Sequence, residues 1–158
     1  MIVDQLNTSL RGGAAIAAQR LHQGLMDAGE TSRLWCKPAR STDELQANIA
    51  EITLREPVSV KSIVQFAKYK IHERQLRGRS DEFEIFTMPW AKAKASHYSD
   101  SLLGGDVLHL HWINWWLDLP SFFDTLPASL PIVWTLHDMN PITGGCHHHD
   151  GCEHFHSQ

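Results

Sequence analysis

The spacing of apolar residues changes within the first 37 positions. Residues 1–9, "MIVDQLNTS", place an apolar run before three turn-forming residues, which predicts a short strand that runs into a loop. After the pair Gly12 and Gly13, apolar positions recur at helical spacing and form one face, made of Ala14, Ala17, Ala18, Leu21, Leu25 and Ala28. Gly29 is a typical stop for that helix, and residues 31–37 have the pattern of a second strand. Strand, glycine loop, helix and strand in this order open a parallel α/β unit.

Two later segments repeat the strand pattern. Residues 106–114, "DVLHLHWIN", and 131–138, "PIVWTLHD", each combine an apolar run with a polar exit. The residues between them have room for a helix or a loop crossing; a further helix is predicted over 59–79, and 91–105 fit a short one. Residues 39–57 have a mixed pattern that predicts no element. We therefore expect an α/β fold, Rossmann-like, with a mostly parallel sheet and flanking helices.

Length, composition and charge narrow the class of protein. A chain of 158 residues with 42% hydrophobic residues can bury one core, so a single domain over 1–158 is expected. A formal net charge of -4 argues against a nucleic-acid partner, which usually needs a basic face. Three cysteines do not make a disulfide framework, and the first residues lack the features of a secretory leader. A cytoplasmic protein is therefore expected.

Histidines lie at or near the carboxyl ends of both late strands. His109 and His111 belong to the first of them, and His137 follows the second. Ligands of open parallel sheets bind beyond these ends. The loop with Gly12 and Gly13 should lie on the same edge, where a helix N-terminus can meet an anionic group. Three separate regions of sequence thus predict one ligand cleft.

Each of these features also has a purely structural interpretation. His109 lies inside its strand and can be a buried, hydrogen-bonded core histidine. His137 can cap the next turn, and a glycine pair before a helix is often only a tight turn. Both interpretations stay open at this point.

The motifs "NTSLRGGAAIAAQRLHQGLMDAGETSRLW", "DVLHLHWIN" and "PIVWTLHDMNPITGGCHHHDGCEHF" resemble the N-terminal half of bacterial family 4 glycosyltransferases of the exopolysaccharide and lipopolysaccharide branch. The resemblance covers both ends of the chain well and residues 39–95 poorly. It implies the GT-B architecture, two Rossmann-like domains facing each other across a cleft. It also implies transfer of a sugar, with retention, from a nucleotide-sugar donor to a glycan or lipid-linked acceptor. Residues 1–158 would then be the acceptor-side domain, without the C-terminal donor-binding domain and inactive alone.

The resemblance also assigns roles to residues. It sets Gly12 and Gly13 near the donor diphosphate and His137, the expected catalytic residue, near the transferred sugar. We expect the substrate-binding side chains to be those of His111, Trp112, Asn114 and Asp138. The rings of Trp112, Trp115 and Trp116 can stack on sugars or fill the core. No cofactor is expected beyond the nucleotide-sugar substrate.

The last 24 residues hold six of the 11 histidines and two of the three cysteines. Thiolates and imidazoles suit zinc, but Cys146 and Cys152 are spaced more widely than a usual structural pair, and no second pair follows. We expect adventitious zinc binding or a flexible loop here, not a functional metal site. Two alternative functions stay open: a zinc-binding interaction module, or a metal-dependent hydrolase that uses the strand-end histidines with Asp138.

The predicted helix over 59–79 pairs an apolar stripe with six Lys and Arg residues. Such a helix can make a peripheral contact with the anionic inner face of the plasma membrane. It can also pack on the sheet as an ordinary surface helix with solvated charges, and this second interpretation is favoured.

Overall fold

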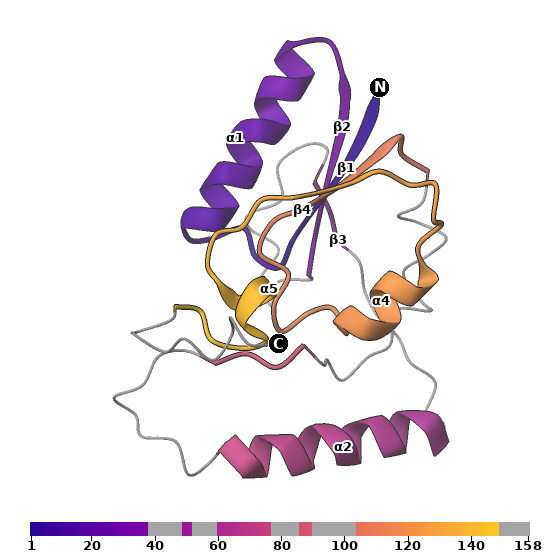
Figure 1. Cartoon of the computed structure of the whole chain (residues 1–158). Helices are drawn as coiled ribbons and strands as arrows, with labels where there is room; N and C mark the ends of the chain where they lie inside the picture. Colours follow the sequence, from indigo (N-terminus) through magenta and orange to yellow (C-terminus); the bar gives the residue numbers. More distant parts are fainter. Residues whose placement is uncertain (38–48, 52–59, 77–85, 90–103, 149–158) are drawn as a thin grey trace.

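A five-stranded, all-parallel sheet forms the centre of the computed structural model, which describes residues 1–37, 49–51, 60–76, 86–89 and 104–148 (Figure 1). Its strands are β1 (Ile2–Asn7), β2 (Thr31–Cys36), β3 (Ile49–Glu51), β4 (Val107–Leu110) and β5 (Ile132–Trp134). This parallel sheet with flanking helices confirms the predicted Rossmann-like α/β class. Strand β3 lies in the segment whose mixed pattern predicted no element.

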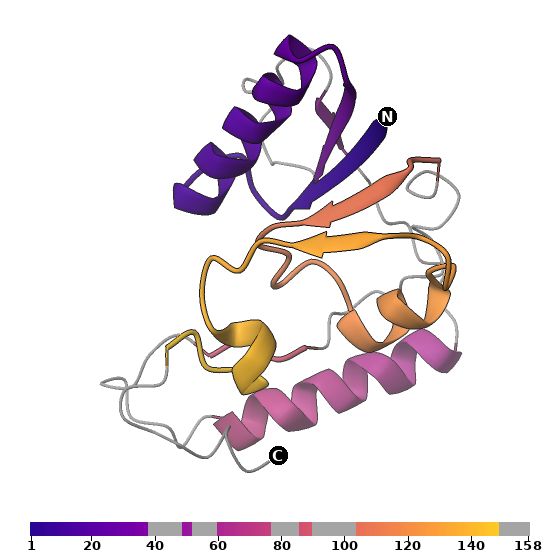
Figure 2. The same ribbon diagram turned by 45° about the horizontal axis from the view of Figure 1, so that its top comes forward.

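The order of the strands reverses direction between β1 and β4. Across the sheet the order is β3-β2-β1-β4-β5, so the chain builds outward from β1 on one side and then continues on the other. Figure 2 shows the arrowheads of β1 (indigo), β4 and β5 (both orange) directed toward the edge where α1 (Gly13–Asp27) begins. Open α/β sheets bind ligands in the crevice beyond such a reversal.

One face of the sheet carries the main apolar cluster. Successive side chains of a strand point to opposite faces, so Leu108 and Leu110 of β4 share this face. The buried members of the cluster are Leu6, Leu108, Leu110, Ile113, Trp116, Leu117 and Phe122. Phe122 comes from α4 (Leu119–Thr125), whose N-cap Asp118 accepts a hydrogen bond from the backbone N–H of Ser121. The segment that joins β4 to β5 could be a helix or a loop crossing from its sequence, and α4 shows that it contains a helix.

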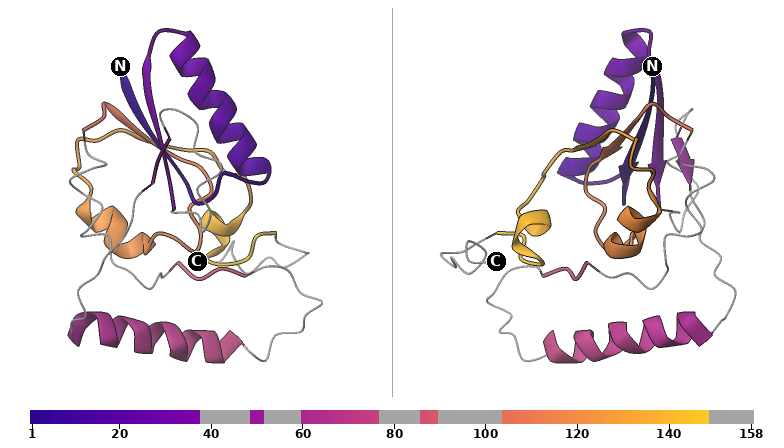
Figure 3. Two further views of the ribbon diagram at one scale, coloured as in Figure 1. Left: turned by 180° about the vertical axis from the view of Figure 1, so that it is seen from behind. Right: turned by 45° about the vertical axis from the view of Figure 1, so that its right-hand side comes forward.

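Helix α1 covers the other face, and Figure 3 (left) shows α1 and α4 on opposite sides of the strands. Its buried residues are Ala15, Ala18 and His22. The apolar stripe predicted from the sequence is therefore correct at Ala18 but wrong at Ala17 and at Leu21, which is 37% exposed. The inward position is taken by His22 because its ring hydrogen-bonds Ser32 of β2.

Helix α2 (Val60–Leu76) confirms the helix predicted over 59–79. Four of its apolar side chains are exposed, to 59, 49, 45 and 58%: Ile63, Val64, Phe66 and Ile71. These side chains do not pack on the sheet, so the favoured interpretation is wrong for them. No helix in the described ranges is both long and apolar enough to cross a bilayer. The helix predicted over 91–105 falls almost entirely outside the described residues.

Candidate functional site

Two loops are joined beyond the carboxyl ends of β1 and β4. The backbone N–H of Thr8 donates to the Trp112 carbonyl at 2.7 Å, and its hydroxyl donates to the Asn114 carbonyl at 2.8 Å. The backbone N–H of Trp112 in turn donates to Oδ1 of Asn7 at 3.0 Å. Asn114, whose carbonyl takes part in this junction, is buried. The loop after β1 and the loop after β4 are thus held side by side, at the edge that the sequence predicted.

Gly12 and Gly13 connect the loop after β1 to helix α1. Gly12 has a φ of 93°, a conformation that side chains rarely adopt, and it is the N-cap of α1 without a side-chain cap. A Cβ atom added at Gly12 or Gly13 would meet no atom within 4 Å. The first N–H groups of a helix lack internal partners, so this backbone suits an anionic ligand. The assignment of these glycines to a diphosphate stays a prediction.

Three histidine rings stack at the end of β4. The ring centroids of His109 and His111 are 4.3 Å apart, and those of His111 and His137 are 5.5 Å apart. Nδ1 of His111 lies 3.2 Å from Nε2 of His137, so the structure brings these two predicted site residues together. His109 is 9% exposed, and its Nε2 lies 2.7 Å from Oγ1 of Thr135. For His109 the interpretation as a buried, hydrogen-bonded core histidine is confirmed.

Burial keeps these rings neutral at pH 7. Burial and, to a smaller extent, the nearby His109 and His137 lower the pKa of His111 to about 4. The pKa of His109 is also lowered, first by burial and then by His137. Burial lowers the pKa of His137 as well, although Asp138 acts in the opposite direction. Each neutral ring therefore has one nitrogen that donates a hydrogen bond and one that accepts.

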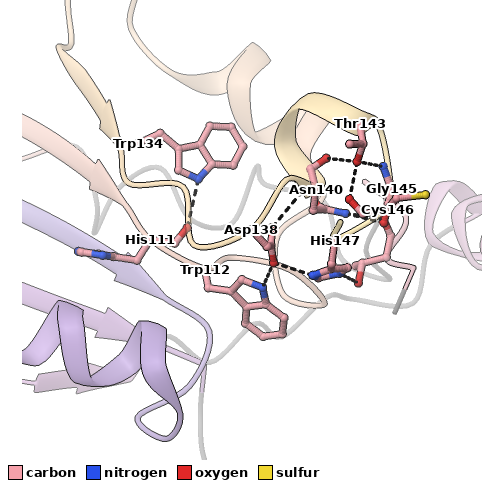
Figure 4. A network of polar contacts seen from close by, with 10 residues as sticks. His111, Trp112, Trp134, Asp138, Asn140, Thr143, Gly145, Cys146 and His147 are labelled. Carbon is pink, nitrogen blue, oxygen red and sulfur yellow. Dashed lines mark hydrogen bonds and ion pairs between the residues drawn. The ribbon is translucent and has the colours of Figure 1, made fainter. Parts of the chain in front are cut away.

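Asp138 anchors the loop that follows β5. Its Oδ2 accepts a hydrogen bond from Nε1 of Trp112 at 2.8 Å and lies 2.6 Å from Nδ1 of His147, while Oδ1 accepts from the Asn140 N–H at 3.0 Å. Figure 4 shows this network, with the side chain of His111 pointing away from it. Both carboxylate oxygens are engaged, which gives no support to a hydrolase that would use Asp138 with the strand-end histidines. Contact of Asp138 with a substrate stays a prediction.

The residues after Asp138 belong to the fold. His147 is 5% exposed, and its Nε2 lies 2.8 Å from Oγ1 of Thr87. Asn140, the first residue of the short helix α5 (Asn140–Thr143), donates from Nδ2 to the carbonyls of Thr87 and Gly145. The expectation of a flexible loop is therefore wrong for the segment from Asn140 to His147, because its polar groups pair with Thr87. Cys152 and the rest of 149–158 lie outside the described residues, and the described ones contain no group of three metal-ligating side chains.

The structure distinguishes the three tryptophans of the loop after β4. Trp116 is 2% exposed and belongs to the apolar cluster, and Trp112 is half-buried with its Nε1 bound to Asp138. Trp115 is 56% exposed, lies edge-on to Trp112 with ring centroids 5.0 Å apart, and has a φ of 60°. Positive φ in a bulky residue costs about 1–3 kcal/mol and often marks a functional position. Trp115 is thus the ring that is open to a ligand.

Three polar residues behind the histidines were not predicted from the sequence. Gln5 of β1, Ser32 of β2 and His22 of α1 are all buried, and they continue the hydrogen bonding from His111. A signal was present in β1, because Asp4, Gln5 and Asn7 are polar residues in a central strand. Central strands of parallel sheets are normally apolar on both faces.

Comparisons with known proteins give one distant relationship. No family model and no solved structure matches the chain. Over 160 residues it is 28% identical to the protein named "Putative colanic acid biosynthesis glycosyl transferase WcaC" of Escherichia coli (strain K12). The chain is thus similar, at low identity, to a protein named as a putative glycosyl transferase. The match covers 97% of the chain, which spans 37% of the length of that relative.

Proposed function

We propose that this chain is the acceptor-side domain of a glycosyltransferase with the GT-B architecture, which uses a nucleotide-sugar donor. The observation that carries the proposal is the grouping of three features where the strand order reverses. They are the open backbone of Gly12 and Gly13, the neutral pair of His111 and His137, and the exposed ring of Trp115. These features suit a diphosphate, a sugar hydroxyl and a sugar face, respectively. The distant relationship to a glycosyl transferase supports the same class.

Each residue has a proposed role in this site. The backbone N–H groups at Gly12 and Gly13 would contact the donor diphosphate, and His137 would hydrogen-bond a hydroxyl of the transferred sugar. Trp115 would stack on the acceptor. Trp112 and Asp138 bind each other. We therefore propose that their main role is to position Trp115 and His137. In the whole enzyme, fixed dipoles would stabilise the departing diphosphate while an acceptor hydroxyl attacks, with retention at the sugar carbon.

The acceptor and the location of the reaction are part of the proposal. The relative is named for colanic acid biosynthesis, and we propose a glycan or lipid-linked acceptor in polysaccharide biosynthesis for this chain. Helix α2 exposes apolar side chains together with Lys68, Lys70 and Arg74, which suits a peripheral contact with an anionic membrane. Co-sedimentation with vesicles that contain anionic lipids tests this contact; we expect Ile63→Asp to weaken it.

A thermal-shift titration with a panel of nucleotide sugars and oligosaccharides, and separately with zinc, tests the proposed site. A ligand that binds only the folded state raises the melting temperature, by an amount that grows with its concentration. We expect the rise with oligosaccharides to be lost in Trp115→Ala and the rise with a nucleotide sugar to be lost in His137→Ala. The control is Phe123→Ala, which removes a surface ring that is 37% exposed on α4. Equal responses in all three variants would reject the proposed site, and a response to zinc alone would favour the interaction module.

A further inference from the structure

A hydrogen-bonded chain of five polar side chains crosses the sheet beneath α1. It begins at His137 and ends at His22 on the helix, passing through the end of β4, then β1, then β2. The distances along it are 3.2 Å from His137 Nε2 to His111 Nδ1, 3.0 Å from His111 Nε2 to Gln5 Oε1, 2.8 Å from Gln5 Nε2 to Ser32 Oγ, and 2.8 Å from Ser32 Oγ to His22 Nδ1.

Four of the five members are buried from solvent. His111, Gln5, Ser32 and His22 are 3, 0, 5 and 4% exposed. Only His137 is half-buried, so the chain reaches the surface at that end alone. Water cannot readily exchange with these buried groups, so the donors and acceptors between His137 and His22 pair with one another. Nε2 of His22, beyond the last bond, is buried and has no hydrogen-bond partner among the described residues.

The chemistry of each member determines which atoms carry protons. Gln5 faces His111 with its carbonyl oxygen, which only accepts, so Nε2 of His111 must be the protonated nitrogen. A neutral imidazole has one N–H, which leaves Nδ1 of His111 as an acceptor. Nε2 of His137 must then donate to it. It follows that Nδ1 of His137 carries a lone pair that can accept a further hydrogen bond.

The neutral state that this reasoning requires has independent support. Burial lowers the pKa of His22, His111 and His137, so each of these rings is neutral at pH 7 and carries a single N–H. The amide of Gln5 is the one member that is neither a hydroxyl nor a ring, and its two ends are chemically different. Its orientation therefore sets the direction of the hydrogen bonds from Ser32 through Gln5 and His111 to His137, whereas the hydroxyl of Ser32 can either donate to His22 or accept from it.

We propose that Gln5 is a positioning residue that fixes His137 in the Nε2–H tautomer, so that Nδ1 of His137 accepts a hydrogen bond from a hydroxyl group of the ligand. A sugar supplies such hydroxyl groups. The class of ligand rests on the proposed function, whereas the tautomer does not. A histidine held in one tautomer discriminates between a hydroxyl donor and a group that can only accept, because the wrong partner leaves a lone pair unpaired.

Nitrogen-15 NMR of the histidine rings tests the tautomer at pH 7.5. In the natural sequence we expect His111 and His137 each to show the shifts of a single Nε2–H tautomer. Gln5→Met removes the acceptor and donor of the amide at similar volume, and we expect the shifts of both rings to move toward tautomer-averaged values. The matched control is Leu34→Met, which sets the same side chain beside Gln5 on β2, and it should leave both rings in one tautomer.

Several outcomes would overturn the proposal. One is an Nδ1–H tautomer of His137 in the natural sequence, and another is Gln5→Met with unchanged ring shifts. If Leu34→Met moves the rings as much as Gln5→Met, the effect comes from packing and Gln5 has no special role.

A titration with the nucleotide sugars and oligosaccharides of the thermal-shift panel tests the ligand. A hydroxyl ligand should move the Nδ1 shift of His137 and leave Nε2 protonated. Protonation of Nδ1 on binding would overturn its assignment as an acceptor. If no sugar binds, the ligand class and the proposed function both fail, while the single tautomer in the first experiment would still stand.

Discussion

Neighbouring residues of β4 and of the position just after it face two different environments. Leu108 and Leu110 enter the apolar cluster beneath α4, where burial and volume determine the stability. His109 and His111 point to the α1 side, where each polar atom needs a partner of the right kind. The difference indicates that one face mainly stabilises the fold and the other mainly carries the candidate chemistry. The two faces should therefore respond to different perturbations.

The largest effect is expected from the apolar face. Phe122→Ala removes a ring that is 1% exposed and should lower the free energy of unfolding by about 3–5 kcal/mol, from lost burial and the cavity left behind. Urea denaturation measures this value. Phe123→Ala, one position along and 37% exposed, should lower it by about 0.5–1 kcal/mol. Similar losses for both variants would contradict the assignment of Phe122 to the core.

Lowering the pH should destabilise the fold through the histidines of the polar face. Because the pKa of His111 is about 4 in the folded chain and 6.5 for an unperturbed histidine, the unfolded chain binds the proton first as pH falls. The stability that comes from keeping the ring of His111 neutral is complete above pH 6.5 and is lost between pH 6.5 and pH 4. It should reach about 3 kcal/mol for His111 alone, with further loss in the same direction from His22, His109 and His137. Urea denaturation at several pH values measures the slope.

Two variants distinguish the faces in this experiment. His111→Gln removes the ring whose pKa is lowered to about 4, so stability should depend less steeply on pH between 6.5 and 4. Phe122→Leu should lower stability at every pH and leave the slope unchanged. If stability depends on pH as steeply in His111→Gln as in the natural sequence, the acid response arises elsewhere in the chain.

Most of the fold was predictable because its signals are local. The period of the apolar residues predicted β1, α1, β2, α2, β4 and β5, since burial on one or two faces requires a regular spacing. The three-residue strand β3 was missed because so short a segment has no period. The buried side of α1 was missed because a hydrogen bond between His22 and Ser32 overrides the apolar pattern.

The grouping of the candidate site residues was predictable from the sequence, but their hydrogen bonds were not. His111, His137 and the glycine loop come from strand ends, and the parallel sheet brings such ends to one edge. Gln5, the partner of His111, lies 106 positions away in the sequence, and Thr87 lies 60 positions from its partner His147, so no local pattern specifies which donor meets which acceptor. Trp112, Trp115 and Trp116 lie within five positions, and the loop conformation, to which the positive φ of Trp115 contributes, places their rings in different environments.

The loop after β5 should show a smaller and more local effect. Asp138→Ala leaves Nε1 of Trp112 and Nδ1 of His147 without their shared acceptor, at a cost of about 1–3 kcal/mol. The amides of Met139 and Thr87, which bond to the carbonyls of His147 and Gly145, should exchange with solvent faster. Asp124→Ala, at an exposed position of α4, is the control. Unchanged exchange at both amides would show that Asp138 does not anchor the loop.

The smallest effect should come from Gly24 in α1, the helix that covers the polar face. Gly24 lies in the helix, and an added Cβ atom would meet nothing within 4 Å, so Gly24→Ala should raise the free energy of unfolding by about 0.5–1 kcal/mol. Gly29, with a φ of 83°, should respond in the opposite sense, because Gly29→Ala forces a side chain into a left-handed conformation at a cost of about 1–2 kcal/mol. Amide exchange within α1 should slow in the first variant, while the ring shifts of His111 and His137 stay unchanged. A change in those shifts would mean that the position of α1, and not the orientation of Gln5, controls the histidines.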